Sequence, residues 1–167
     1  MTRLISAAFM ILAAQPGLAD IAVRFTESAP KDRFVIENTG NCALSGQVTL
    51  DLNGSAGGLI FDVTGNGAGV QVYQPFELVV GGDALTGLPE VRDGDQALVL
   101  EVRGLAPGET IAFTIDVDDT ASARGTMVSG SEITGAAVAV AQPEMISRGS
   151  FSGDATAKVS TAACPTA

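Results

Sequence analysis

Five aspartates are the side chains of this sequence whose type and spacing could do chemistry. Asp116, Asp118 and Asp119 lie at the end of an alternating strand pattern, and Asp93 and Asp95 lie in a turn sequence upstream. In an extended strand, residues two apart share a face, and we expect Asp116 and Asp118 to point outward together. Clustered carboxylates repel one another unless a hard, oxygen-coordinated cation such as Ca²⁺ neutralises them. The five residues are therefore a candidate calcium site.

A solvated loop rim is the alternative for the same aspartates, with Arg92, Arg103 or Arg124 as their partners. The spacing differs from an EF-hand loop, because no glycine and distal glutamate follow residues 116–119. Two cysteines and no histidine are also too few for a structural zinc site. Calcium is thus the only cofactor that the residues indicate.

Catalysis is constrained by the absence of histidine. No Ser-His-Asp or Cys-His nucleophile can be built, nor a histidine-ligated metal. Ser28 and Lys31 have the Ser-x-x-Lys spacing, but they lie in a link between two strands, whereas that motif begins a helix. The glycine-rich stretch 65–69 precedes a strand pattern, so it predicts a turn and not a phosphate loop. We expect a non-enzymatic protein; a carboxylate-based enzyme is the remaining alternative.

The beginning of the chain has the layout of a signal peptide. Arg3 is followed by an apolar run over 4–14 and by the small-residue site Gly17-Leu18-Ala19, which predicts cleavage before Asp20. The run of about eleven residues is shorter than the roughly twenty that span a bilayer. We expect residues 1–19 to be removed and residues 20–167 to form one secreted or periplasmic domain without a membrane span.

Charge and cysteine content indicate an exported, acidic protein. Nineteen Asp and Glu against nine Lys and Arg give a net charge of −10, so a nucleic acid is not an expected partner. Cys42 and Cys164 are the two cysteines. In an oxidising compartment they predict one disulfide that ties the C-terminal tail to the second strand region.

An alternating apolar pattern predicts β-strands along most of the mature chain. The expected strands cover residues 21–25, 34–37, 48–53, 59–63, 70–80, 97–102, 111–117, 138–140 and 155–159. Turn clusters rich in glycine, asparagine and aspartate separate them, and Pro75 marks the fifth as an edge or bulged strand. The pattern is typical of a single antiparallel β-sandwich.

Several segments together resemble the bacterial aggregation factor core family, small exported proteins named after the core protein of sponge aggregation factors. The segments are residues 29–36, 38–42, 58–62, 74–78 and 105–120. The Asn-Thr-Gly turn and the Leu-x-Pro-Gly-Glu strand start also resemble immunoglobulin-like adhesion modules. The sponge protein mediates calcium-dependent, carbohydrate-assisted cell adhesion, and the resemblance implies a surface or extracellular adhesion role for this chain. We expect a protein or a surface glycan as partner.

These observations lead to two functional interpretations. The first is an exported, non-enzymatic adhesion or cell-surface interaction module with an immunoglobulin-like sandwich and a calcium site. The second is a periplasmic binding or accessory protein that holds no metal and meets its partner through an exposed edge strand.

Overall fold

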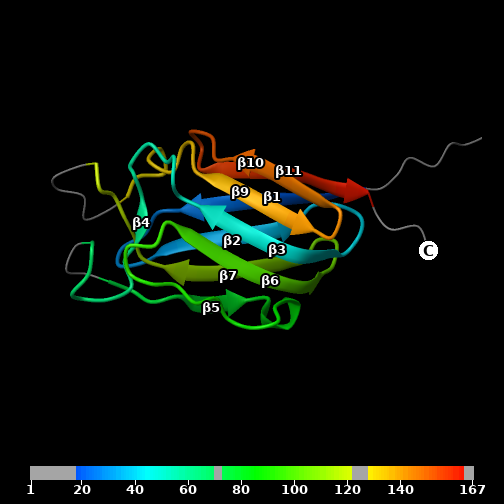
Figure 1. The fold of residues 1–167 in the computed structure, drawn as a ribbon, viewed down its shortest axis with the longest axis horizontal. Coiled ribbons are helices and arrows are strands. Elements are labelled where there is room, and N and C mark those ends of the chain that lie inside the picture. Colours follow the sequence, from blue (N-terminus) through cyan, green and yellow to red (C-terminus); the bar gives the residue numbers. More distant parts are fainter. Residues whose placement is uncertain (1–17, 70–72, 122–127, 164–167) are drawn as a thin grey trace, which may run out of the picture.

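The protein is an antiparallel β-sandwich in the computed structural model, which describes residues 18–69, 73–121 and 128–163 (Figure 1). A five-stranded sheet packs against a four-stranded sheet, and a two-stranded sheet lies at one end. The expected immunoglobulin-like antiparallel sandwich is confirmed at the level of this architecture. No helix among the described residues is long and apolar enough to cross a membrane.

All strand pairs are antiparallel, and the two large sheets have the orders β11-β1-β2-β7-β5 and β10-β9-β3-β6. The first sheet contains β1 (Leu18–Thr26), β2 (Asp32–Asn38), β5 (Glu77–Val80), β7 (Thr110–Ile115) and β11 (Thr156–Ala163). The second contains β3 (Leu44–Asp51), β6 (Ala97–Leu105), β9 (Ala137–Gln142) and β10 (Met145–Ser150). The small sheet pairs β4 (Ile60–Phe61) with β8 (Val117–Asp118), and a 3₁₀ turn, η1 (Gly82–Ala84), follows β5.

The core forms where the alternating apolar residues of the two sheets meet, as the period of the sequence predicts. In β2, for example, Phe34 and Ile36 are fully buried, while Arg33 and Val35, which alternate with them, are half-buried. Phe34 stacks on Phe113 of β7 with ring centroids 5.3 Å apart, and Phe25 of β1 lies 5.0 Å from Phe34. These rings join three neighbouring strands into one layer.

The expected strand over 111–117 breaks at Asp116. β7 ends at Ile115 in the five-stranded sheet, and the chain continues as β8, which pairs with β4 instead. The amides and carbonyls at the break are still used: the Asp62 amide donates to the Asp116 carbonyl at 3.1 Å, and the Asp116 amide donates to the Gln74 carbonyl at 3.1 Å. β4 and the stretch before β5 therefore cover the end of β7.

Other strand predictions were only partly correct. Of the expected strand over 70–80, the structure shows β5 at Glu77–Val80; residues 70–72 lie outside the described part. β5 is an edge strand with a register shift between Leu78 and Val80, as Pro75 indicated. β10 was not predicted.

Candidate functional site

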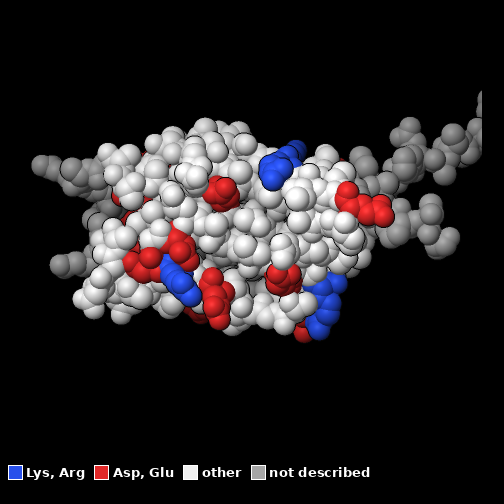
Figure 2. Space-filling model, in the orientation of Figure 1, with Lys and Arg blue, Asp and Glu red and all other residues white. Residues whose placement is uncertain are grey.

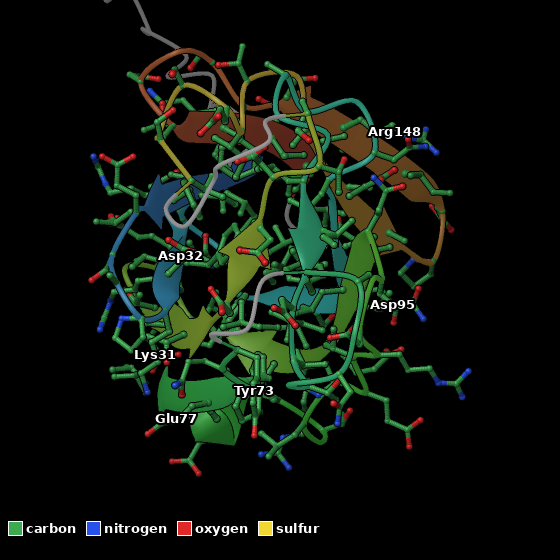
Figure 3. The ribbon with its side chains drawn as sticks, turned by 90° about the vertical axis from the view of Figure 1, so that its left-hand side faces the viewer. Lys31, Asp32, Tyr73, Glu77, Asp95 and Arg148 are labelled. Atoms are coloured by element: carbon green, nitrogen blue, oxygen red, sulfur yellow. The ribbon has the colours of Figure 1, made fainter. Side chains whose placement is uncertain are left out.

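The structure brings Asp116 and Asp118 together with two aspartates that the sequence analysis missed, Asp32 and Asp62. We call these four residues and Asp93 the carboxylate cluster; they lie at the end of the sandwich seen in Figure 3, where Asp32 is labelled. The prediction that Asp116 and Asp118 point outward was wrong. They are 7% and 4% exposed, because β4 and the stretch before β5 cover that face.

Asp62 is the most enclosed member of the carboxylate cluster. It follows β4 directly, its side chain is 0% exposed, and neither carboxylate oxygen accepts a hydrogen bond from any described residue. Oδ2 of Asp116 is likewise buried without a described partner. Buried polar atoms in native proteins nearly always have partners, so these three oxygens require an explanation.

Burial and mutual repulsion raise the pKa of several of these carboxyl groups. Desolvation is the largest cause in each case and raises the pKa of Asp32, Asp62 and Asp116 from 3.8 to about 7. Asp93 lies within hydrogen-bonding reach of Asp62 and raises its pKa further, and the charges of Asp118 and Asp116 add to the effect. The charges of Asp118 and Asp32 likewise raise the pKa of Asp116 further.

The carboxylates of Asp93 and Asp95 accept backbone amides and so stabilise turns. They do not converge with Asp116 and Asp118 on one ligand position. Oδ2 of Asp93 accepts the Ala68 amide at 2.6 Å, and its Oδ1 accepts the Val63 and Thr64 amides. Led by the Ala68 bond, these interactions lower the pKa of Asp93 to about 2. Oδ2 of Asp95 accepts the Arg92 amide at 2.8 Å.

The remaining predicted residues do not complete the expected set. Asp119 follows β8 and is half-buried. The alternative of a solvated rim paired with arginines was wrong for Asp116 and Asp118, which are buried. Arg103 donates to the Asp83 carbonyl at 2.6 Å, and Arg124 lies outside the described residues. Among the described residues, no three carboxylates already take up ligand positions around one point.

The glycine-rich stretch 65–69 wraps the carboxylate cluster at very close range. A Cβ atom on Gly69 would lie 2.2 Å from Oδ2 of Asp118 and 2.4 Å from Oδ2 of Asp62. On Gly67 it would lie 1.5 Å from Oδ2 of Asp93. Only residues without a side chain can pass so near these carboxylates.

β5 and an adjoining groove, which Val63 next to Asp62 helps to line, form a second exposed feature. Val79 and Val80 of β5 are 47% and 48% exposed. A groove of about 500 Å³ adjoins the start of β5. Its lining is largely apolar: Val63, Thr64, Pro75, Phe76, Leu88, Pro89, Glu90, Val91 and Arg92. Leu88 is 66% exposed.

Charge is spread thinly over the molecule. On the face shown in Figure 2, acidic groups outnumber basic ones and the basic groups lie apart from one another. The one ion pair among the described residues joins Lys31 to Glu77, side by side in Figure 3. No lysine or arginine of the described part therefore neutralises the carboxylate cluster through an ion pair.

The disulfide between Cys42 and Cys164 stays a prediction, because Cys164 lies outside the described residues. Described residues close to each cysteine in the sequence, Ala163 and Thr39, both adjoin the first part of β1. β11 ends at Ala163, whose register partner is Leu18 of β1. The Asp20 carbonyl of β1 accepts the Thr39 amide at 2.8 Å, at the start of the turn that holds Cys42. The predicted signal peptide also lies mostly outside the described part.

No protein-family model, no curated protein and no solved structure matches this chain.

Proposed function

We propose that the protein is an exported, non-enzymatic interaction module that binds an extended segment of a partner protein along β5. The observation that carries this proposal is that β5 pairs with β7 on one side only, while Val79 and Val80 stand exposed on it. An unpaired strand edge offers main-chain donors and acceptors to a partner strand.

The other three edges of the two large sheets are covered in the described part of the chain. β10 and β11 lie side by side and close one flank of the sandwich: a Cβ atom on Gly149 would lie 2.1 Å from the Lys158 carbonyl oxygen. On the other flank, Leu85 bridges to Val102, and the Thr86 amide donates to the Glu101 carbonyl of β6. These contacts leave β5 as the accessible edge.

The groove beside β5 supplies the selectivity that main-chain pairing lacks. Phe76 forms part of it and packs on Phe113 of the core, with ring centroids 4.8 Å apart, so this wall of the groove is rigid. Leu88 forms an exposed apolar rim. An extended peptide with apolar side chains at alternate positions could pair with β5 and place one of them here.

Two further features define the partner. β5 has only four residues and a bulge, a combination that discourages pairing with arbitrary strands. The net charge of −10 favours a basic or neutral segment over an acidic one. A conventional sugar platform has less support, because the chain has no tryptophan and one tyrosine.

The non-enzymatic and exported parts of the proposal rest on the sequence. The chain has no histidine for conventional acid–base or nucleophilic catalysis, and its first nineteen residues have signal-peptide layout. The resemblance to bacterial aggregation factor core proteins supports adhesion at the cell surface. A periplasmic accessory role would use the same edge strand.

Selection of peptides from a displayed library tests the proposal. Binding peptides should be extended and apolar at alternate positions, and Val79→Glu or Leu88→Asp should weaken their binding at least tenfold, as about 1.4 kcal/mol would do. Val99→Glu is the matched control, because Val99 is 39% exposed on β6 of the opposite sheet. Equal binding by all three variants would rule out the β5 edge.

A further inference from the structure

We propose that Asp62, Asp116 and Asp118 bind one hard divalent cation, best matched by Ca²⁺, which fastens β4 to β8. This site goes beyond the interaction surface on β5 and does not depend on it. It also differs from the five aspartates that the sequence indicated, because it adds Asp62 and leaves out Asp93, Asp95 and Asp119.

Three carboxylate oxygens at this site are buried without a hydrogen-bond donor in the described part of the chain. Both carboxylate oxygens of Asp62 and Oδ2 of Asp116 are buried and accept no hydrogen bond from a described residue. Both side chains are more than nine-tenths buried. A buried carboxylate without donors is strongly unfavourable unless a proton or a cation compensates for its charge.

Three chain segments converge at these carboxylates: the end of β4, the short strand β8 and the turn that holds Gly69. Asp62 follows β4, Asp118 lies in β8, and Ile60 is the register partner of Asp118. Oδ2 of Asp62 and Oδ2 of Asp118 lie within 2.4 Å of a single position, the one that a Cβ of residue 69 would take. Asp116 is two residues before Asp118; the charge of Asp116 acts on Asp62, and the charge of Asp118 acts on Asp116. The three side chains therefore share one enclosed region beside Gly69.

No lysine or arginine among the described residues forms an ion pair with Asp62 or Asp116. The one ion pair among residues 18–69, 73–121 and 128–163 joins Lys31 to Glu77. Asp32 and Asp93 are excluded as ligands because their oxygens accept backbone amides, from Ser28 and Val117 in one case and from Val63, Thr64 and Ala68 in the other. They add negative charge around the site.

The donor set selects the class of cation. The three residues offer only carboxylate oxygens, the ligands that Ca²⁺ and Mg²⁺ prefer over softer metals. Asp62 follows one two-residue strand, Asp116 lies at a strand break and Asp118 lies in a second two-residue strand. Such irregular geometry suits the flexible coordination of Ca²⁺ better than the strict octahedron of Mg²⁺. Binding requires the side chains to rotate toward one another, a movement that repulsion opposes and a cation favours.

A proton is the competing occupant. Asp62 and Asp93 lie close enough to share one when Asp62 is protonated. A shared proton would satisfy Asp62 in part, but it would leave Oδ2 of Asp116 without a partner. The experiment must therefore separate proton from cation.

Luminescence of Tb³⁺, which replaces Ca²⁺ in oxygen sites, provides a local test. Tyr73 is the only tyrosine and the chain has no tryptophan. Its ring lies against Gly65, with Cε1 2.6 Å from the Cβ position of that residue, in the turn that wraps the carboxylates. Tb³⁺ added to the mature protein should give tyrosine-sensitised emission that saturates, and CaCl₂ should displace it more effectively than MgCl₂.

Two variants identify the ligands. Asp62→Asn and Asp116→Asn should each abolish the sensitised emission and the saturable rise in Tm that CaCl₂ gives the native protein. Without cation, both variants should melt at or above the native Tm, because each removes a buried charge that repels its neighbours. A residue with a merely structural role would not show this reversal. Asp83→Asn is the control, since Asp83 is exposed in η1.

Three results would overturn the site. One is no Tb³⁺ emission together with no change of Tm in millimolar CaCl₂, which would leave the shared proton as occupant. Another is an unchanged CaCl₂ response in both variants, which would place any cation elsewhere. The third is that Asp83→Asn loses the Tb³⁺ emission and the CaCl₂-induced rise in Tm to the same extent, which would show that cation binding is nonspecific. Peptide binding at β5 is measured separately, so either proposal can fail alone.

Discussion

The amide of Val117 donates a 3.1 Å hydrogen bond to Oδ2 of Asp32, so a carboxylate at the start of β2 holds the short strand β8 in place. The other oxygen of Asp32 accepts the Ser28 amide at 3.0 Å. One buried side chain thus connects the link between β1 and β2 to the segment that carries Asp116 and Asp118. The position of these two aspartates depends on it.

Stability in the presence of chelator should decrease as pH rises from about 4 to about 7. The pKa of Asp32 is about 7 in the folded protein, raised by desolvation from 3.8, so the folded state holds a proton that the unfolded state has lost in this window. This contribution to the free energy of unfolding is fully present below pH 3.8, the unfolded pKa, and is lost as pH rises through the folded pKa of about 7. Each tenfold difference in proton affinity is worth about 1.4 kcal/mol.

Measuring Tm as a function of pH in the presence of chelator tests whether stability decreases as pH rises. Asp62 and Asp116 act in the same direction, so Asp32→Asn should reduce the slope without abolishing it. Asp154→Asn is the control, because Asp154 is exposed and its hydrogen bonds from Ser152 and Thr156 lower its pKa. A Tm that rises steadily from pH 4 to pH 7 would contradict the assignment.

Gly69→Ala should destabilise the protein by about 1–3 kcal/mol, as overpacking a closely packed site does. The new methyl group would lie 2.2 Å from Oδ2 of Asp118 and 2.4 Å from Oδ2 of Asp62, and the turn would have to move. Gly87→Ala is the matched control, because no atom lies within 4 Å of its Cβ position. Urea unfolding of both variants measures the difference, and similar values would be inconsistent with the close approach.

Asn38→Ala should cost at least about 2 kcal/mol. Asn38 is fully buried, and its side-chain amide donates to the carbonyls of Cys42 and Leu105, both at 2.8 Å, while its oxygen accepts the Gly40 amide at 3.0 Å. It therefore joins the turn after β2 to the end of β6. Asn53→Ala, at an exposed turn position, should change Tm by far less in the same melting experiment.

Phe113→Ala should be among the most damaging single changes, at about 3–5 kcal/mol. The ring of Phe113 is fully buried and packs on both Phe34 and Phe76, with centroids 5.3 and 4.8 Å away. Phe76→Ala should cost less, because Phe76 is half-buried and touches the same cluster from one side. Chemical denaturation gives the order, and a larger loss for Phe76→Ala would be unexpected.

Most strands could be predicted because their alternation is a local property. Ile21, Val23 and Phe25, for example, are separated by polar or small residues, and the structure buries all three. β10 could not be predicted in this way. Its residues from Met145 to Ser150 are half-buried or exposed, since the strand lies at the margin of the sheet, and so they show no apolar period.

The carboxylate cluster depends on contacts between distant parts of the chain, which a one-dimensional pattern does not contain. Alternation assigned Asp116 to a solvent face, but it could not show that Gln74 and Asp62 would cover that face. Asp62 itself gave one usable signal, an acidic residue within the apolar run Ile60, Phe61 and Val63. A carboxylate within an apolar run either reaches solvent because the strand ends there, or is buried and needs a partner that compensates for its charge.

Leu18 at the start of β1 and Ala163 at the end of β11 are register partners, and they lie at the pole of the sandwich opposite the carboxylate cluster (Figure 1). A molecule held near either residue would present that cluster and the groove beside β5 as its distal pole. Tension applied between Leu18 and Ala163 would peel β1 from β11 one hydrogen bond at a time. The rest of the sandwich would carry no load until that pair had opened.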